Sequence, residues 1–260
     1  MSATASVSLA WTDNEMLVAR HGAGLAGEQF RRMRIRLEGV NETLGGTMKV
    51  VLVTSPMKGD GKTATAANLA FGLAGESGRK VLLVDVDMRK PRLHEFFRGS
   101  VRAGLGDVLA GGMALSDAVA PIDGMTLDLL ALPKGADRRV DPLPIDRLRA
   151  LLVEARKRYD YIICDGPPVL PIADTAAAAR LSDGVVLVVR AAVTPREAVA
   201  RSLGLIDRNR LVGFVLNAVP EGSLDRYYYT YDSTEAGGGA RKGHGKQKRT
   251  RGGSFELKEE

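Results

Sequence analysis

Short apolar runs alternate with amphipathic segments along most of the chain. The apolar runs predict strands at 49–54, 80–85, 126–132, 161–165, 185–190 and 212–217. The segments between them predict helices at 63–75, 105–109, 115–119, 146–158, 173–181 and 195–209, the last with Thr194 as its cap and Pro195 as its first residue. Continuous apolar strands separated by helices are typical of a parallel sheet covered on both faces. The sequence therefore predicts a single α/β domain with a mostly parallel central sheet.

Both ends of the chain differ from this pattern. Residues 1–25 are small, polar and weakly periodic, which predicts a flexible arm. The predicted domain covers 26–222 and begins with a helix at about 27–40, which has an apolar stripe and several arginines. Residues 223–260 contain a tyrosine cluster followed by a Gly-, Lys- and Arg-rich stretch, which predicts a disordered tail.

Composition narrows the class of protein only slightly. The hydrophobic share of 45% and the charged share of 26% are ordinary for a globular protein. A single cysteine, Cys164, excludes an intramolecular disulfide. The apolar runs are too short to span a membrane, and the first residues lack the features of a secretory signal. We therefore expect a cytoplasmic protein.

The net charge of +6 equals the charge of one basic run in the tail, and the remainder of the chain sums to zero. The run has six basic residues without an intervening acid: Arg241, Lys242, Lys246, Lys248, Arg249 and Arg251. A positive folded surface is therefore not indicated, and we expect no specific nucleic-acid partner.

A phosphate-binding pattern, TSPMKGDGKTATAANLA, follows the first predicted strand of the sheet and opens the next helix. Gly59 and Gly61 allow the backbone N–H groups to face phosphate oxygens, and Lys62 can reach the β- and γ-phosphates. The Thr63 hydroxyl can bind Mg²⁺. Pro56 stands where the strict motif has its first glycine. The predicted nucleotide-binding residues are Gly59, Asp60, Gly61, Lys62, Thr63 and Ala64, with ATP and Mg²⁺ as ligands.

Two acidic motifs come at the ends of later strands. VLLVDVDMRKP places Asp85 and Asp87 after the second of these strands, and YIICDGPP places Asp165 after another. Ligands of open α/β sheets bind at the carboxyl ends of the strands, so these carboxylates are expected to face the phosphate loop. Alone, each aspartate is also a common cap or turn former. Together with Lys62 they predict a magnesium nucleotide site held by Thr63, Asp85 and Asp165.

These motifs, together with GLGDVLAGG and GFVLNAVP, resemble the bacterial tyrosine kinases of capsule and exopolysaccharide synthesis over roughly residues 26–231. That family is related to the Min-system and partition ATPases. The resemblance implies that Lys62 and Thr63 form the Walker A pair, Asp85 and Asp87 the Walker A′ motif, and Asp165 the Walker B aspartate. It also implies an active-site role for Arg89 and a purine contact for Asn217. Met57 replaces the signature lysine of partition ATPases, which favours the kinase branch.

Two further segments match this family. Glu28, Arg31 and Arg34 match its E-x-x-R-x-x-R oligomerisation motif, although a solvated charged face is the alternative. Tyr227, Tyr228, Tyr229 and Tyr231 match its phosphate-acceptor cluster, although tyrosines also favour an edge strand.

The resemblance implies an ATP-dependent tyrosine autokinase in which each tail enters the active site of the next subunit of a ring. We expect Asp85 to act as the base toward the tyrosine hydroxyl, Asp165 and Thr63 to organise Mg²⁺, and Lys62 to neutralise charge on the transferred phosphoryl group. Expected partners are a membrane-bound regulator of polysaccharide chain length, which recruits and activates the kinase, and a tyrosine phosphatase. The alternative is a Min-like ATPase switch or scaffold without kinase activity.

Overall fold

The computed structural model describes residues 9–11, 24–98, 103–132 and 143–220. The strands are β1 (Ala10–Trp11), β2 (Val50–Thr54), β3 (Val81–Asp85), β4 (Phe97–Arg98), β5 (Ala120–Pro121), β6 (Leu127–Leu130), β7 (Tyr161–Asp165), β8 (Gly184–Arg190) and β9 (Leu211–Asn217). The α-helices are α2 (Leu25–Thr43), α3 (Lys62–Gly75), α4 (Leu105–Ala110), α5 (Leu115–Ala118), α6 (Ile145–Ala155), α7 (Ala173–Leu181) and α8 (Arg196–Leu205). Two 3-10 turns, η1 (Leu93–Phe96) and η2 (Arg208–Arg210), complete the described elements.

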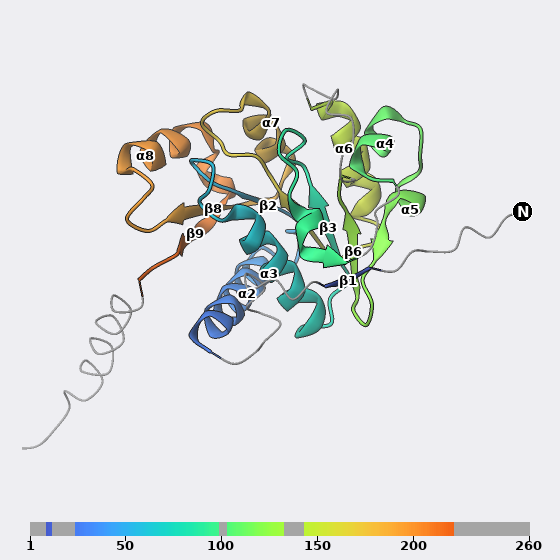
Figure 1. Cartoon of the computed structure of the whole chain (residues 1–260), viewed down its shortest axis with the longest axis horizontal. Coiled ribbons are helices and arrows are strands. Elements are labelled where there is room, and N and C mark those ends of the chain that lie inside the picture. Colours follow the sequence, from blue (N-terminus) through green and yellow to red (C-terminus); the bar gives the residue numbers. More distant parts are fainter. Residues whose placement is uncertain (1–8, 12–23, 99–102, 133–142, 221–260) are drawn as a thin grey trace, which may run out of the picture. The chain divides into compact units, whose positions relative to one another are not determined.

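The described part of the chain forms a seven-stranded sheet in the order β5-β6-β3-β7-β2-β8-β9 (Figure 1). All neighbours in it are parallel except β5 and β6. β7 lies between β2 and β3, and its Asp165 is in register with Val53 on one side and Asp85 on the other. The predicted α/β fold is therefore confirmed, and the topology brings the acidic strand ends together.

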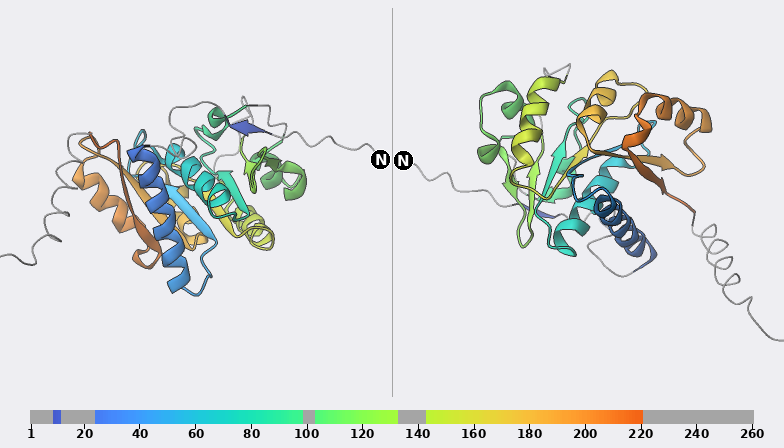
Figure 2. Two further views of the ribbon diagram at one scale, coloured as in Figure 1. Left: turned by 90° about the horizontal axis from the view of Figure 1, so that it is seen from below. Right: turned by 180° about the vertical axis from the view of Figure 1, so that it is seen from behind.

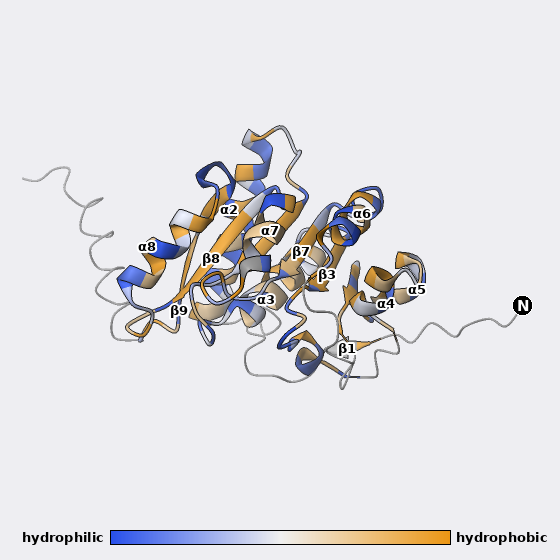
Figure 3. Cartoon of the chain, turned by 90° about the horizontal axis from the view of Figure 1, so that it is seen from above, coloured by the Kyte–Doolittle hydropathy of each residue, from blue (hydrophilic) through white to orange (hydrophobic). Residues whose placement is uncertain are grey.

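Helices cover both faces of this sheet (Figure 1; Figure 2). One face packs against α2 and α3, where Leu37, Leu69 and Leu73 are buried. The other face packs against α4 to α8 through residues such as Leu105 and Leu152. Apolar colour prevails along β8 and alternates with polar colour on α8 in Figure 3. This is the difference expected between strands buried on both faces and helices buried on one.

A small antiparallel pair of strands was not predicted. β1 pairs with β4, and Leu9 is completely buried, with backbone hydrogen bonds to Pro121 and Asp123. The prediction of a flexible arm over 1–25 is therefore wrong at residues 9–11. A two-residue strand followed by no periodic pattern gives no sequence signal, because its pairing depends on a partner almost 90 residues away.

Element boundaries differ from prediction most at α2, which spans Leu25–Thr43 instead of about 27–40, and at α8. α8 begins at Arg196 after Pro195 and ends at Leu205, not at 209. The Thr194 hydroxyl donates to Asp60 instead of capping the helix, which explains the error at its start.

No helix among the described residues is long and apolar enough to cross a bilayer. The contacts divide the chain between Val219 and Pro220, and the predicted boundary at 222 lies outside the described residues.

Candidate active site

The phosphate loop connects β2 to the first turn of α3. Gly59 and Gly61 have φ angles of 91° and 101°, a left-handed region that side chains with a Cβ rarely adopt. Lys62 is the first residue of α3, and Thr63 and Ala64 follow in the same turn. Helix N-termini present unbonded N–H groups and partial positive charge, so this loop is built to receive an anion.

Lys62 lies against two carboxylates. Its Nζ donates a 2.8 Å hydrogen bond to Asp87 Oδ2 and lies 3.6 Å from Asp165 Oδ1. Burial alone would lower the pKa of Lys62, but the negative charges of Asp165, Asp87 and Asp85 raise it above its usual value. The ammonium therefore stays protonated and is available to phosphate oxygens.

Asp165 is buried with its hydrogen-bonding capacity unmet. Within the described part of the chain, neither of its carboxylate oxygens accepts a hydrogen bond. Burial raises its pKa from 3.8 to about 6, while the Lys62 ammonium and the Thr63 hydroxyl act in the opposite direction. A buried carboxylate that accepts no hydrogen bond is costly, and the Lys62 ammonium offsets only part of that cost, so these two oxygens are expected to serve a ligand.

Asp85 organises the loop that follows β3. Its Oδ2 accepts the backbone N–H groups of Arg92 and Leu93, and its Oδ1 accepts that of Asp87. Burial and the neighbouring Asp165 charge nevertheless raise the pKa of Asp85 well above its usual range. The side chain thus fixes the position of Asp87 and retains unusual basicity for a carboxylate.

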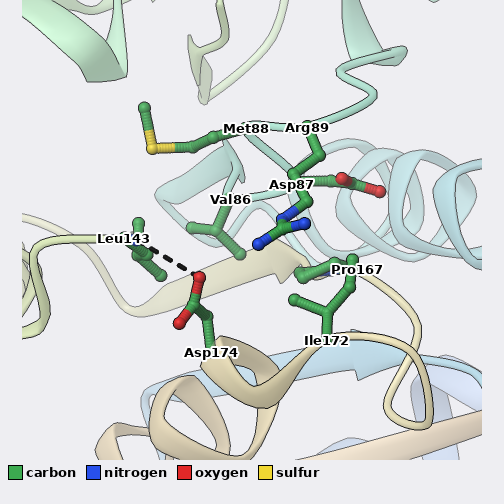
Figure 4. Close-up of a pocket in the computed structure, with 8 residues that line it drawn as sticks. All are labelled: Val86, Asp87, Met88, Arg89, Leu143, Pro167, Ile172 and Asp174. Carbon is green, nitrogen blue, oxygen red and sulfur yellow. Dashed lines mark hydrogen bonds between the residues drawn. The ribbon is translucent and has the colours of Figure 1, made fainter. Parts of the chain in front are cut away.

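Arg89 and Asp87 line one small pocket beside this cluster. Its other walls are Val86, Met88, Leu143, Pro167, Ile172 and Asp174 (Figure 4). The Arg89 guanidinium points into this space, and the Leu143 N–H donates to Asp174 at its rim. The structure therefore brings Arg89 near the predicted site on the side of the β3 and β7 strand ends.

Magnesium fits these residues only together with a nucleotide. Among the described residues, no three His, Cys, Asp or Glu side chains are placed so that together they could hold a metal ion without other ligands. Mg²⁺ usually takes one or two protein oxygens together with substrate phosphates and water. The Asp165 carboxylate, which accepts no hydrogen bond from the described residues, and the nearby Thr63 hydroxyl match that arrangement.

Asn217 and the oligomerisation residues lie at their predicted elements but make internal contacts. The Asn217 amide donates to the backbone oxygen of Asp60. Arg34 is largely buried and bonds to Glu38, Ser77 and Glu76.

Glu28 and Arg31 lie nearer the start of α2, and each is almost half exposed. Arg31 and Arg34 both contact Glu76, so these two motif residues share a partner but differ in exposure. The predicted acceptor tyrosines Tyr227, Tyr228, Tyr229 and Tyr231 lie outside the described residues. Thr194, whose hydroxyl contacts the phosphate loop, was missed as a site residue because the Thr-Pro pair predicts a helix cap.

The chain was compared with known proteins. A family model described as an AAA domain matches residues 48–208. The tyrosine-protein kinase YwqD of Bacillus subtilis is 33% identical over 213 residues, covering 80% of this chain and 89% of that protein. The succinoglycan biosynthesis transport protein ExoP of Rhizobium meliloti is 30% identical over 208 residues, covering 77% of this chain but only 26% of ExoP.

Solved structures give the same picture. The chimerical protein CapA2B2 superposes with a TM-score of 0.71 and 26% identity, covering 82% of this chain and 93% of that one. The septum site-determining protein MinD from Pyrococcus horikoshii, solved with Mg-ADP, has a TM-score of 0.54 and 26% identity, covering 68% of this chain and 76% of that one. With a nucleotide-binding P-loop, the matching fold and a relative of this coverage, the chain belongs to the bacterial protein-tyrosine kinases.

Proposed function

We propose that this protein is an ATP- and Mg²⁺-dependent autokinase that phosphorylates its own tyrosine cluster at 227–231. Its phosphorylation state would regulate the polymerisation or export of a capsular or extracellular polysaccharide. One observation carries the proposal. The P-loop lysine lies within a buried group of three carboxylates, Asp85, Asp87 and Asp165, of which Asp165 lacks hydrogen-bond partners in the described part of the chain. This arrangement is suited to a magnesium–phosphate ligand rather than to stabilising the fold.

The chemistry assigned to each group follows from its position. Bound Mg²⁺ would supply charge neutralisation at the phosphates, held by Thr63 and Asp165. Lys62 binds the transferred phosphoryl group and neutralises its developing charge. Asp85 takes the proton of the attacking phenol, a role for which its raised pKa is favourable. Its Oδ1 accepts one backbone hydrogen bond, from Asp87, which leaves a lone pair for that proton.

The proposed assembly is a ring in which each tail enters a neighbouring active site. Glu28 and Arg31 are the part of the motif that is exposed on α2 for contact with another subunit. Activation comes from a membrane-bound chain-length regulator that recruits the kinase to the inner face of the plasma membrane, and a tyrosine phosphatase reverses the reaction. The similarity to ExoP supports the link to polysaccharide assembly.

The decisive test is intact-mass spectrometry of the purified chain after incubation with ATP and Mg²⁺, alone and with a cytoplasmic peptide of the activator. We expect mass gains in phosphate steps that map to residues 227–231. A Lys62→Met variant should gain none, and a variant with Phe at all four tail tyrosines should gain none while still binding ATP. Asp85→Asn should bind ATP but lose most of the kinase rate, and full activity in this variant would refute the base assignment.

A MinD-like ATPase switch is the second candidate, favoured by the structural match to MinD and by a phosphate site that serves hydrolysis equally well. The same experiment separates the two functions. Release of free phosphate from a protein that never gains mass, in the presence of its activator, would establish the switch and exclude the autokinase.

A further inference from the structure

The phosphate loop is tied to the sheet by its central residue, Asp60. This side chain is only 2% exposed and lies between the two glycines of the loop. Its Oδ2 accepts the Met57 N–H at 2.9 Å, and its Oδ1 accepts the Thr194 hydroxyl at 2.7 Å. Its backbone oxygen accepts the Asn217 amide at 2.9 Å. Asp60 is therefore bound from inside the loop and from two distant segments.

Those two segments follow neighbouring strands. Thr194 lies in the connection after β8, and Asn217 is the last residue of β9. The Thr194 hydroxyl also accepts the Arg190 N–H, while the Arg190 guanidinium donates to the Gly59 oxygen at 3.4 Å. The loop is thus held on the β8 and β9 side, whereas its lysine faces Asp87 and Asp165 on the other.

Packing at Gly61 shows how close this contact is. A Cβ on Gly61 would lie 1.9 Å from the Asn217 Nδ2 atom, so a side chain there would displace the amide. The glycine therefore serves two purposes, the left-handed turn and the close approach of Asn217.

Strained backbone positions lie close to Thr194 and Asn217, which both bond to Asp60. Among the described residues, the non-glycine positions with positive φ are Ala192 at 57° and Ala218 at 54°. One lies two residues before Thr194 and the other directly after Asn217. Such conformations are unfavourable for residues with a Cβ and persist where the surrounding structure enforces them. Both strained positions thus stand close to residues whose side chains bond to the phosphate loop.

We infer that Thr194 and Asn217 are positioning residues that hold the P-loop in its phosphate-binding shape through Asp60. Nucleotide affinity then depends on the ends of β8 and β9 as well as on the loop itself. The inference rests on nucleotide binding at this P-loop and is independent of which tyrosine receives the phosphate. It also gives Asp60 a role that the loop motif alone does not assign, because its carboxylate faces Thr194 and Met57.

The test uses Thr194→Val, which keeps the side-chain shape and removes the hydroxyl, beside Thr194→Ser, which keeps the hydroxyl. The Kd for Mg-ATP is measured by calorimetry on the full chain, and KM and kcat by initial rates of phosphate transfer. We expect the valine variant to raise Kd and KM roughly tenfold, since it loses a buried bond to a charged group. Saturating ATP should restore kcat to within about threefold, and the serine variant should match the original chain within about twofold.

Thr126→Val is the matched control, because the Thr126 hydroxyl bonds backbone oxygens of Ala74 and Arg79 at the far end of α3. It should lower Tm without changing Kd. An unchanged Kd for Thr194→Val, failure of serine to rescue, or an equal loss in the Thr126 control would overturn the inference. Should Thr194→Val fail to fold, Thr194→Ala provides the second variant, which removes the same hydroxyl donor in a smaller side chain and must also raise Kd. Because Kd needs no acceptor, a failed autokinase would leave this outcome interpretable.

Discussion

Two aspartates at opposite ends of the parallel strands show how differently this fold uses the same side chain. Asp183, before β8, accepts the Lys49 and Val50 N–H groups and the Arg156 guanidinium. Asp165, at the end of β7, accepts no hydrogen bond within the described part of the chain. Burial alone would raise the pKa of Asp183, but the Arg156 guanidinium and the two N–H groups lower it, whereas burial raises that of Asp165. A buried carboxylate that accepts hydrogen bonds stabilises the fold, whereas one that accepts none is suited to binding a ligand.

The largest difference in activity is expected between variants of Lys62 and Lys49, the lysines at the two ends of the strands. Lys62→Met is expected to lower the rate of tyrosine phosphorylation at least roughly 100-fold, because charge stabilisation at the phosphoryl group is lost. Lys49→Met should keep that rate and lower Tm, since the Lys49 Nζ donates to the Arg156 and Tyr159 oxygens. Initial rates and thermal denaturation of both variants test this. Equal loss of activity in both variants would show that the two ends of the strands do not differ in function.

Neutralising the two aspartates should change stability in opposite directions. Without nucleotide at pH 7.5, Asp165→Asn should raise Tm by roughly 3–6 °C, because repulsion within the carboxylate cluster is relieved. Asp183→Asn should lower Tm by a similar amount, since it weakens the bonds to Arg156 and the backbone. Scanning calorimetry gives both values. Shifts of the same sign would contradict the comparison, whereas loss of kinase activity only in the Asp165 variant would extend it.

The pH dependence sharpens the same contrast. The pKa of Asp165 is raised to about 6, so the folded protein favours the protonated side chain. The stability that Asp165 contributes is therefore fully present below about pH 4 and is lost as the pH rises through 6. The advantage of Asp165→Asn should therefore grow between pH 4.5 and 7.5. For Asp183 the pKa is lowered, so its contribution is present above about pH 4 and is lost in more acidic solution. Urea denaturation across this range measures both trends, and a pH-independent difference for Asp165→Asn would exclude its unusual ionisation.

The smallest expected effect concerns Tyr159, a buried tyrosine that is distinct from the tail cluster. Its hydroxyl donates a 2.6 Å bond to Asp128, and burial together with that bond raises its pKa. Tyr159→Phe should cost about 1 kcal/mol of unfolding free energy and leave the phosphate mass gains unchanged. Fewer phosphate steps in this variant would instead make Tyr159 an acceptor.

The sequence predicted the regular part of the fold and the atoms that carry charge. The bounds of β7 and α7 match their predictions because each is a run of one pattern between clear breaks. Lys62, Asp87 and Asp165 come together because parallel strands place their carboxyl ends at one edge.

Long-range contacts account for what could not be predicted. β1 depends on a partner almost 90 residues away, and no local preference of Thr194 indicates that its hydroxyl would bond to Asp60, 134 residues earlier. Arg34 was likewise grouped with Glu28 and Arg31 by spacing, although its bonds to Glu38 on the same helix and to Ser77 after α3 leave it largely buried. Spacing along a chain identifies chemical types, whereas tertiary packing decides which partner each group obtains.

The insertion of β7 between β2 and β3 has a consequence for synthesis on the ribosome. The strand before the P-loop, β2, and the strand that ends at Asp85, β3, are not neighbours in the sheet. Both pair with residues 161–165. A nascent chain that has only its first half outside the exit tunnel therefore holds β2 without either of its neighbours, β3 with β6 alone, and no complete phosphate site. Such non-local pairing is slow and exposes strand edges in the meantime. Assembly of the nucleotide site is thus a late event, and a ligand added early has nothing to bind.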